Sequence, residues 1–173
     1  MIHPLSLDNI NRKAPYKVEL DEMTGSYDFV THCGVQISIA FENDFLIQTD
    51  VSYQLIIGNS NQKKSPRDHK LQLTILTIIE EFFRKNQAAM LYICETGDGK
   101  QQMRNRLFKY WFDSYEFNSK FSLYTTHIID EEGVPNFAAL ILRNDNPKIV
   151  EVVTEFTQTA KLLREKPNEE NCQ

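Results

Sequence analysis

Apolar and polar residues alternate in the first third of the chain, with the two-residue period of a half-buried β-strand. The alternation covers residues 27–31 and resumes at residues 35–41. Gly34 lies between the two runs and can adopt the positive φ that a tight turn requires, so the two runs predict a hairpin. Residues 51–57 predict a third strand, and residues 16–20 predict a weaker one before the hairpin.

A helical period of three to four residues begins after residue 65. Ser65 and Pro66, followed by Asp68, are typical of a helix start, with the serine as N-cap and the proline at the first helical position. The helix is predicted to run to about Lys85 and to cover one face of a sheet. Its apolar face consists of Leu71, Ile75, Leu76, Ile78, Ile79, Phe82 and Phe83.

The second half of the chain alternates between strand and helix patterns. The predicted elements are a buried strand at 90–94, a glycine turn at 96–99, a helix over 100–117, strands at 121–129 and 137–143, and a last helix that starts at Asn146. The apolar face of the last helix is predicted to contain Ile149, Val150, Val153, Phe156, Ala160 and Leu163. This order predicts an α+β fold with a mixed, mostly antiparallel sheet and packed helices.

The length of 173 residues suits one domain with its own hydrophobic core. Residues 1–14 show no sustained period, and residues 165–173 are polar and contain a proline. We therefore expect a single domain over residues 1–173, with loose tails at 1–14 and 165–173.

Charge and cysteine content argue against several classes of protein. The net charge of -5 opposes a dedicated nucleic-acid-binding protein, which needs a dense basic surface. The chain has no run of 18 apolar residues and no signal-peptide pattern at its N-terminus, so we expect a cytoplasmic protein that does not enter membranes. The three cysteines and four histidines have neither metal-binding nor triad spacing, so no metal site is predicted.

The order of the elements over residues 27–143 resembles the core of the Gcn5-related N-acetyltransferase fold. In that family a glycine-rich loop wraps the pyrophosphate of coenzyme A, and a tyrosine of the second helix acts as general acid. Here residues 58–67 contain one glycine and a proline, and Leu107-Phe108-Lys109 has phenylalanine in place of the tyrosine. The resemblance therefore implies an acetyltransferase-like topology with a degenerate catalytic site.

A second resemblance covers residues 66–112. It rests on the segments Leu91-Tyr92-Ile93-Cys94-Glu95, Asp98-Gly99-Lys100-Gln101, Arg104-Asn105-Arg106-Leu107-Phe108 and Trp111-Phe112. These segments are similar to a family of small cytoplasmic bacterial proteins, common in Bacteroides-like bacteria, that has no established activity. The resemblance implies neither a mechanism nor site residues.

Arg104 is the most unusual polar residue, because it falls within the apolar arc of its predicted helix, one turn after Lys100. A guanidinium on a packing face needs a partner, so one interpretation is a structural ion pair with Glu95, Asp98 or a carboxylate of the antiparallel strands. The other is an anion site in which Arg104 and Lys100 assist the N-terminus of the helix.

A basic loop and an aromatic helix supply the other candidates. Lys63, Lys64 and Arg67 form a basic cluster that is either a solvated loop or a contact site for an anion or nucleotide. Tyr110 and Phe112 flank the apolar face of their helix, so they are predicted to leave an exposed patch that contacts a protein partner or a second copy of the chain.

The sequence favours a small non-catalytic binding or protein-interaction module that uses no cofactor, with no catalytic residue assigned. The alternative is an N-acyltransferase that depends on acyl-coenzyme A, with acetyl-CoA as cofactor, and that uses residues 58–68 and the turn at 95–98. The two functions differ in one structural expectation. The enzyme requires the strands that end near Ile57 and Glu95 to part and form an open cleft.

Overall fold

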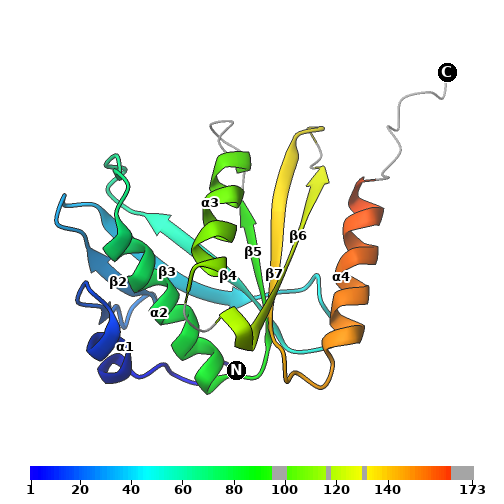
Figure 1. Cartoon of the computed structure of the whole chain (residues 1–173), viewed down its shortest axis with the longest axis horizontal. Helices are drawn as coiled ribbons and strands as arrows, with labels where there is room; N and C mark the ends of the chain where they lie inside the picture. Colours follow the sequence, from blue (N-terminus) through cyan, green and yellow to red (C-terminus); the bar gives the residue numbers. More distant parts are fainter. Residues whose placement is uncertain (95–100, 116–117, 130–131, 165–173) are drawn as a thin grey trace.

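The computed structural model describes residues 1–94, 101–115, 118–129 and 132–164, except for the side chains of residues 101–105 and 118. Within these ranges the strands form a seven-stranded sheet in the order β1-β2-β3-β4-β5-β7-β6 (Figure 1). The strands are β1 (Glu19–Leu20), β2 (Tyr27–Val30), β3 (Gln36–Asn43), β4 (Ser52–Asn59), β5 (Ala89–Cys94), β6 (Phe121–Ile129) and β7 (Pro135–Arg143). β4 and β5 run parallel, and the other neighbouring strands run antiparallel. The predicted α+β fold with a mixed, mostly antiparallel sheet is confirmed.

Helices cover both faces of the sheet. They are α1 (Leu7–Lys13), α2 (His69–Lys85), α3 (Gln101–Asp113) and α4 (Ile149–Arg164). The first three share one hydrophobic core with the strands, which includes Ile10, Phe82 and Phe108. α4 belongs to a second core, in which Val152 and Phe156 join side chains of β5 and β7. Figure 1 shows α4 beside β6 and β7, apart from the other helices.

The hydrophobic patterns of the strands follow from the number of faces that are covered. β5 is covered on both faces, with Met90 in the core under α2 and Leu91 in the core under α4, so its sequence is continuously apolar. β3 alternates because its second face is less covered. Its Ile39 is fully buried, and the ring of Phe41 stacks on Phe82 of α2 with the centroids 4.5 Å apart.

The parallel pairing of β4 with β5 stops before either strand ends. Four residue pairs join the strands, from Ser52–Ala89 to Leu55–Tyr92. Beyond this point β4 continues to pair with β3 as far as Asn59, and β5 continues to pair with β7. The final residues of the two strands therefore belong to different halves of the sheet, and the strands diverge in Figure 1.

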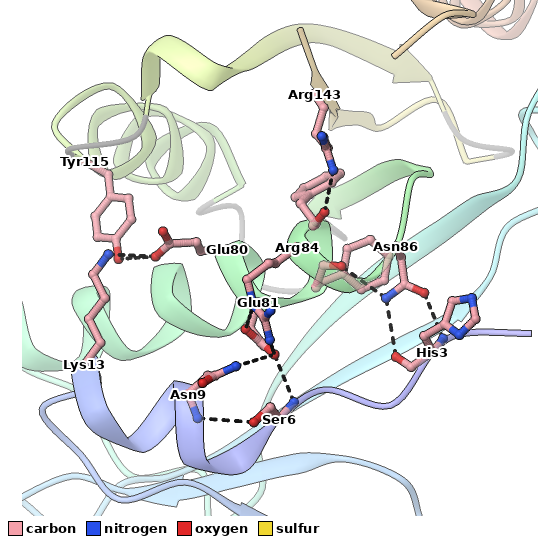
Figure 2. Close-up of polar contacts among 12 residues, drawn as sticks. His3, Ser6, Asn9, Lys13, Glu80, Glu81, Arg84, Asn86, Tyr115 and Arg143 are labelled. Atoms are coloured by element: carbon pink, nitrogen blue, oxygen red, sulfur yellow. Dashed lines mark hydrogen bonds and ion pairs between the residues drawn. The ribbon is translucent and has the colours of Figure 1, made fainter. Parts of the chain in front are cut away.

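The N-terminal segment is not the loose tail that the sequence predicted. Ser6 caps α1 by accepting a hydrogen bond from the backbone of Asn9, and Ile10 has no exposed surface. The backbone N–H of Ser6 also donates to the buried carboxylate of Glu81 on α2, 3.1 Å away (Figure 2). The expectation for residues 1–14 is therefore wrong, because two buried side chains, Leu5 and Ile10, fix the segment without producing a regular period. The predicted tail at residues 165–173 lies outside the described residues.

The start of α2 is also displaced from its prediction. The helix begins at His69 with Asp68 as its N-cap, so Ser65 and Pro66 belong to the preceding loop. Asp68 accepts hydrogen bonds from the backbone N–H groups of Lys70 and Leu71 at 2.9 and 3.2 Å. A short run of Ser, Pro and Asp offers more than one acceptable cap, and tertiary contacts of Asp68 select between them.

Within α4 the apolar face is rotated slightly from the predicted one. Val152 is fully buried and Val150 is largely exposed, although the sequence predicted Val150 on the packing face. Phe156 and Ala160 are buried as predicted. The helix begins at Ile149, three residues after the predicted start.

Candidate functional site at the start of α2

A polar cluster at the start of α2 joins three residues that are far apart in the sequence. The hydroxyl of Tyr16 lies 2.6 Å from a carboxylate oxygen of Asp68 and 2.7 Å from Nδ1 of His32. The backbone N–H of His32 donates to the same hydroxyl at 3.3 Å. The phenol donates its single proton to Asp68, so its contact with Nδ1 of His32 is a hydrogen bond only if Nδ1 carries a proton and donates it to the hydroxyl oxygen. The arrangement is a hydrogen-bonded chain from a carboxylate to an imidazole at the surface.

Each member of the cluster is positioned by its own element. Tyr16 lies in the connection between α1 and β1, and its ring stacks on Phe29 of β2 with the centroids 5.9 Å apart. His32 belongs to the turn between β2 and β3, where Gly34 has a φ of +76° as predicted for the hairpin. Asp68 is fixed as the N-cap of α2, and its side chain is 6% exposed.

The cluster shifts the ionisation of its two acidic members in opposite directions. Burial opposes ionisation of Asp68, but the hydrogen bonds from Tyr16 and from two backbone N–H groups outweigh it, so the pKa of Asp68 lies below its ordinary value. Burial raises the pKa of Tyr16, and the hydrogen bond to the Asp68 carboxylate raises it further. The pair therefore holds a neutral phenol against an ionised carboxylate at neutral pH.

The basic loop is fastened to the same turn. Asn61 donates to the carbonyl of Gly34 at 2.7 Å and accepts from the backbone N–H of Gln36 at 3.2 Å. Lys63 lies close to the turn, because its Nζ is 3.0 Å from the position that a Cβ on Gly34 would occupy. Lys63, Lys64 and Arg67 are all exposed, so the structure fixes the two ends of the loop and presents the cations to solvent.

The remaining predicted anion-binding residues are on α3 or just before it. Lys100 lies outside the described residues, as does the side chain of Arg104, whose backbone belongs to α3. The ion pair and the anion site predicted for Arg104 therefore stay predictions.

Of the two residues predicted to form an exposed aromatic patch on α3, one is exposed and the other is buried. Tyr110 is 67% exposed, as expected for a residue at the surface. Phe112 is 3% exposed and lies edge-on to Phe121 of β6, with the ring centroids 6.4 Å apart, so it cannot contribute to a partner surface. Among the side chains of α3 that the structure describes, Phe108 and Phe112 are buried, so Phe112 lies on the packing face and not beside it.

Two features bear directly on coenzyme binding. The first N–H groups of α2, which form an anion-binding position in many proteins, already bond to the carboxylate of Asp68. Phe108, for which the resemblance to acetyltransferases predicts a tyrosine, is 3% exposed and stacks on Tyr92 at a centroid distance of 4.5 Å. The aromatic pair thus lies against β5 just where its pairing with β4 stops.

A second polar cluster lies between α1 and α2 and holds these helices together (Figure 2). Glu80 accepts from Lys13 at 2.8 Å and from the hydroxyl of Tyr115 at 3.2 Å. Glu81 accepts two hydrogen bonds from Arg84, each at 2.7 Å. A shallow hollow is lined by Asn9, Lys13, Thr77, Glu80, Glu81 and Arg84. Because its charges are engaged with one another, this cluster is better suited to fastening α1 than to binding a ligand.

Sequence reasoning missed the Tyr16–His32–Asp68 cluster. His32 follows Tyr16 by 16 positions and Asp68 follows it by 52, so no local spacing indicates that the three residues meet. Among the residues that the structure describes, no group of three or more His, Cys, Asp or Glu side chains could hold a metal ion. In the same residues, no helix combines the length and apolar character needed to cross a membrane.

Residues 67–158 match the model of a family of unknown function (DUF6169), which accounts for more than half of the chain. The chain belongs to this family. The segment shared with DUF6169 contains Asp68 and runs from α2 into α4, whereas Tyr16 and His32 precede it. No curated protein and no solved structure matches the chain.

Proposed function

We propose that this chain is a non-catalytic binding module of the bacterial cytoplasm, built on an acetyltransferase-like fold. The observation that carries the proposal is the capping of α2 by Asp68, whose carboxylate occupies the N–H groups that a phosphate would need. A bound pyrophosphate at this point would face a negative charge that the fold keeps ionised. Lys63, Lys64 and Arg67 supply side-chain cations nearby but no replacement for the backbone donors.

The residue at the expected acid position supports the same conclusion. Phe108 has no proton to donate, and its ring is buried against Tyr92. An acyl-transfer reaction at this point would need another group to protonate the departing thiolate. The topological resemblance is supported by the order of the elements, in which an antiparallel set of strands precedes helix, strand, helix, two strands and helix.

An N-acyltransferase that depends on acyl-CoA is the second candidate, because one observation favours it. The pairing between β4 and β5 ends at Leu55–Tyr92, so the strands part on the side where the enzyme would need an opening. The basic loop at residues 60–68 follows the end of β4 and would be the contact for the coenzyme phosphates.

Calorimetric titration with acetyl-CoA separates the two functions. For the binding module we expect a dissociation constant weaker than about 10 micromolar, which corresponds to less than about 7 kcal/mol of binding free energy. The same titration is made with a Lys63→Ala/Arg67→Ala variant and with a matched Lys85→Ala/Arg164→Ala variant, whose exposed cations lie on other elements. Tighter binding to the wild type that is lost in the first variant and kept in the second would establish the coenzyme site and overturn the proposal.

A further inference from the structure

β6 is the edge strand at one side of the sheet, and it differs from the edge strand at the other side in how well it is protected against pairing with a further strand. The opposite edge is β1, which is two residues long and carries the Lys17–Glu19 ion pair beside it. β6 is nine residues long, and every one of its residues pairs with β7. Its sequence, from Phe121 to Ile129, contains no Asp, Glu, Lys, Arg, Pro or Gly. Long uncharged edge strands are the ones that pair with further strands.

The backbone groups that point away from the sheet can be assigned from the ladder. The N–H of Asn144 donates to the carbonyl of Lys120 at 2.9 Å, which makes this a hydrogen-bonded pair of the antiparallel ladder. Such pairs alternate along an antiparallel ladder, so the even-numbered residues of β6 exchange hydrogen bonds with β7. The amides and carbonyls of Leu123, Thr125 and His127 therefore point toward the outer edge.

The side chains on this edge are accessible. Thr125 and His127 are exposed on the face that carries α3, and Tyr124 is 36% exposed on the face that carries α4. α4 packs against the same face of β6 and β7 without covering Tyr124 fully. Among the described residues, no strand pairs with the outer edge of β6.

We propose that β6 pairs antiparallel with β6 of a second copy of this chain, about a two-fold axis at Thr125. The axis makes Thr125 face its own copy and places Leu123 opposite His127, so the outward backbone groups of each copy meet as hydrogen-bonded pairs. On the other face Tyr124 lies opposite Thr126. Aromatic and β-branched cross-strand pairs of this kind stabilise antiparallel sheets, and the register places no two like charges opposite each other.

A second copy fits this edge better than an unrelated peptide does, because the sequence of β6 complements itself. Thr125 is the middle residue of the nine, so the two-fold axis brings the full length of both strands into register. The pairing extends the sheet through both molecules and removes an exposed edge from each. It does not depend on whether the chain binds acetyl-CoA, so the calorimetric outcome leaves it standing.

Charge-paired variants at the axis test the proposal. Wild-type protein at about 100 micromolar should sediment with twice the chain mass and dissociate on dilution. Thr125→Lys and Thr125→Glu should each sediment as monomers at the concentration at which the wild type is dimeric, because each places two like charges directly opposite. An equimolar mixture of the two variants should restore the dimer, since the charges across the axis are then opposite.

Val30→Lys and Val30→Glu provide the matched control, because Val30 is an exposed strand residue on β2, far from β6 in the sheet order. These variants should remain dimeric singly, and circular dichroism should be the same for all five proteins. A monomeric wild type at 100 micromolar, a Thr125→Lys variant that stays dimeric, or a mixture that stays monomeric would each overturn the pairing.

Discussion

Glu81 is a carboxylate that the fold removes from water and surrounds with donors. Its side chain is 5% exposed and accepts hydrogen bonds from Ser6 and Arg84, with Asn9 at 3.5 Å. Burial opposes its ionisation, but the hydrogen bond from Arg84 and the other donors outweigh burial, so the pKa of Glu81 lies below its ordinary value. The residue therefore connects the N-terminal segment to α2 through charge-assisted bonds.

Replacing Glu81 by alanine should lower the free energy of unfolding by roughly 2 kcal/mol, the cost of leaving the backbone donor of Ser6 without its acceptor. The larger penalty of a stranded buried charge does not apply, because the Arg84 side chain is half exposed and stays solvated. Urea denaturation followed by circular dichroism measures the change. Glu22→Ala, at an exposed position, is the control and should change stability by less than about 0.5 kcal/mol. Equal effects of the two substitutions would refute this role of Glu81.

At the scale of elements, α1 shows how a short polar helix is held by few contacts. Its seven residues are too few for stability in isolation. Ile10 supplies its buried residue, and the hydroxyl of Tyr27 accepts from the backbone N–H of Leu5 at 3.1 Å just before the helix. The helix thus depends on tertiary contacts with α2 and β2.

Ile10→Ala should therefore cost about 3 kcal/mol, as expected for removing a fully buried aliphatic side chain. Thermal and urea unfolding measure the loss, with Leu162→Ala on the exposed side of α4 as the control, which should change stability little. A near-neutral Ile10→Ala variant would mean that α1 contributes little to the folded state.

The contrast between α1 and α2 shows what the sequence can predict. The seven apolar residues predicted to face the sheet from α2 are all buried, because a long regular period determines a face whatever lies opposite. α1 has no such period, so its docking through Glu81 and Ile10 was not visible. The Tyr16–His32–Asp68 cluster was not predicted for a related reason. Its members meet through the packing of three separate segments, and no local sequence pattern encodes that packing. Phe112 was misplaced because its ring packs against Phe121 of β6, which shifts the buried face of α3 toward Phe112.

At the scale of the whole molecule, several carboxylates ionise more readily in the folded state than in the unfolded chain. Besides Asp68 and Glu81, Glu155 of α4 has a lowered pKa, because hydrogen bonds from Thr49 and from the backbone of Gln48 and Thr49 outweigh its burial. Protonation therefore favours the unfolded chain. The stabilisation from these groups is complete above their unfolded pKa values and is lost as the pH falls through their lower folded values.

Stability should consequently be nearly constant from about pH 7 to pH 5 and should decline below about pH 4. Urea midpoints measured across this range give the profile. Glu155→Gln should flatten the acid decline, because one proton-linked group is removed, whereas Glu151→Gln at an exposed position on the same helix should not. A decline that is as steep in Glu155→Gln as in the wild type would exclude Glu155 as a contributor.

The four residue pairs that connect β4 to β5, from Ser52–Ala89 to Leu55–Tyr92, form a joint between two parts of the sheet and bear on the order in which the chain folds. On one side of the joint β2, β3 and β4 follow one another directly, and on the other β6 and β7 form a hairpin, so each set can pair early from neighbouring segments. Pairing Leu55 with Tyr92 closes a long loop that contains α2, and the entropy cost of closing this loop is offset by only four residue pairs. We expect this joint to form after the rate-limiting step. In stopped-flow experiments, Leu55→Ala should then accelerate unfolding while refolding keeps nearly its wild-type rate, and slowed refolding would place the joint in the nucleus instead.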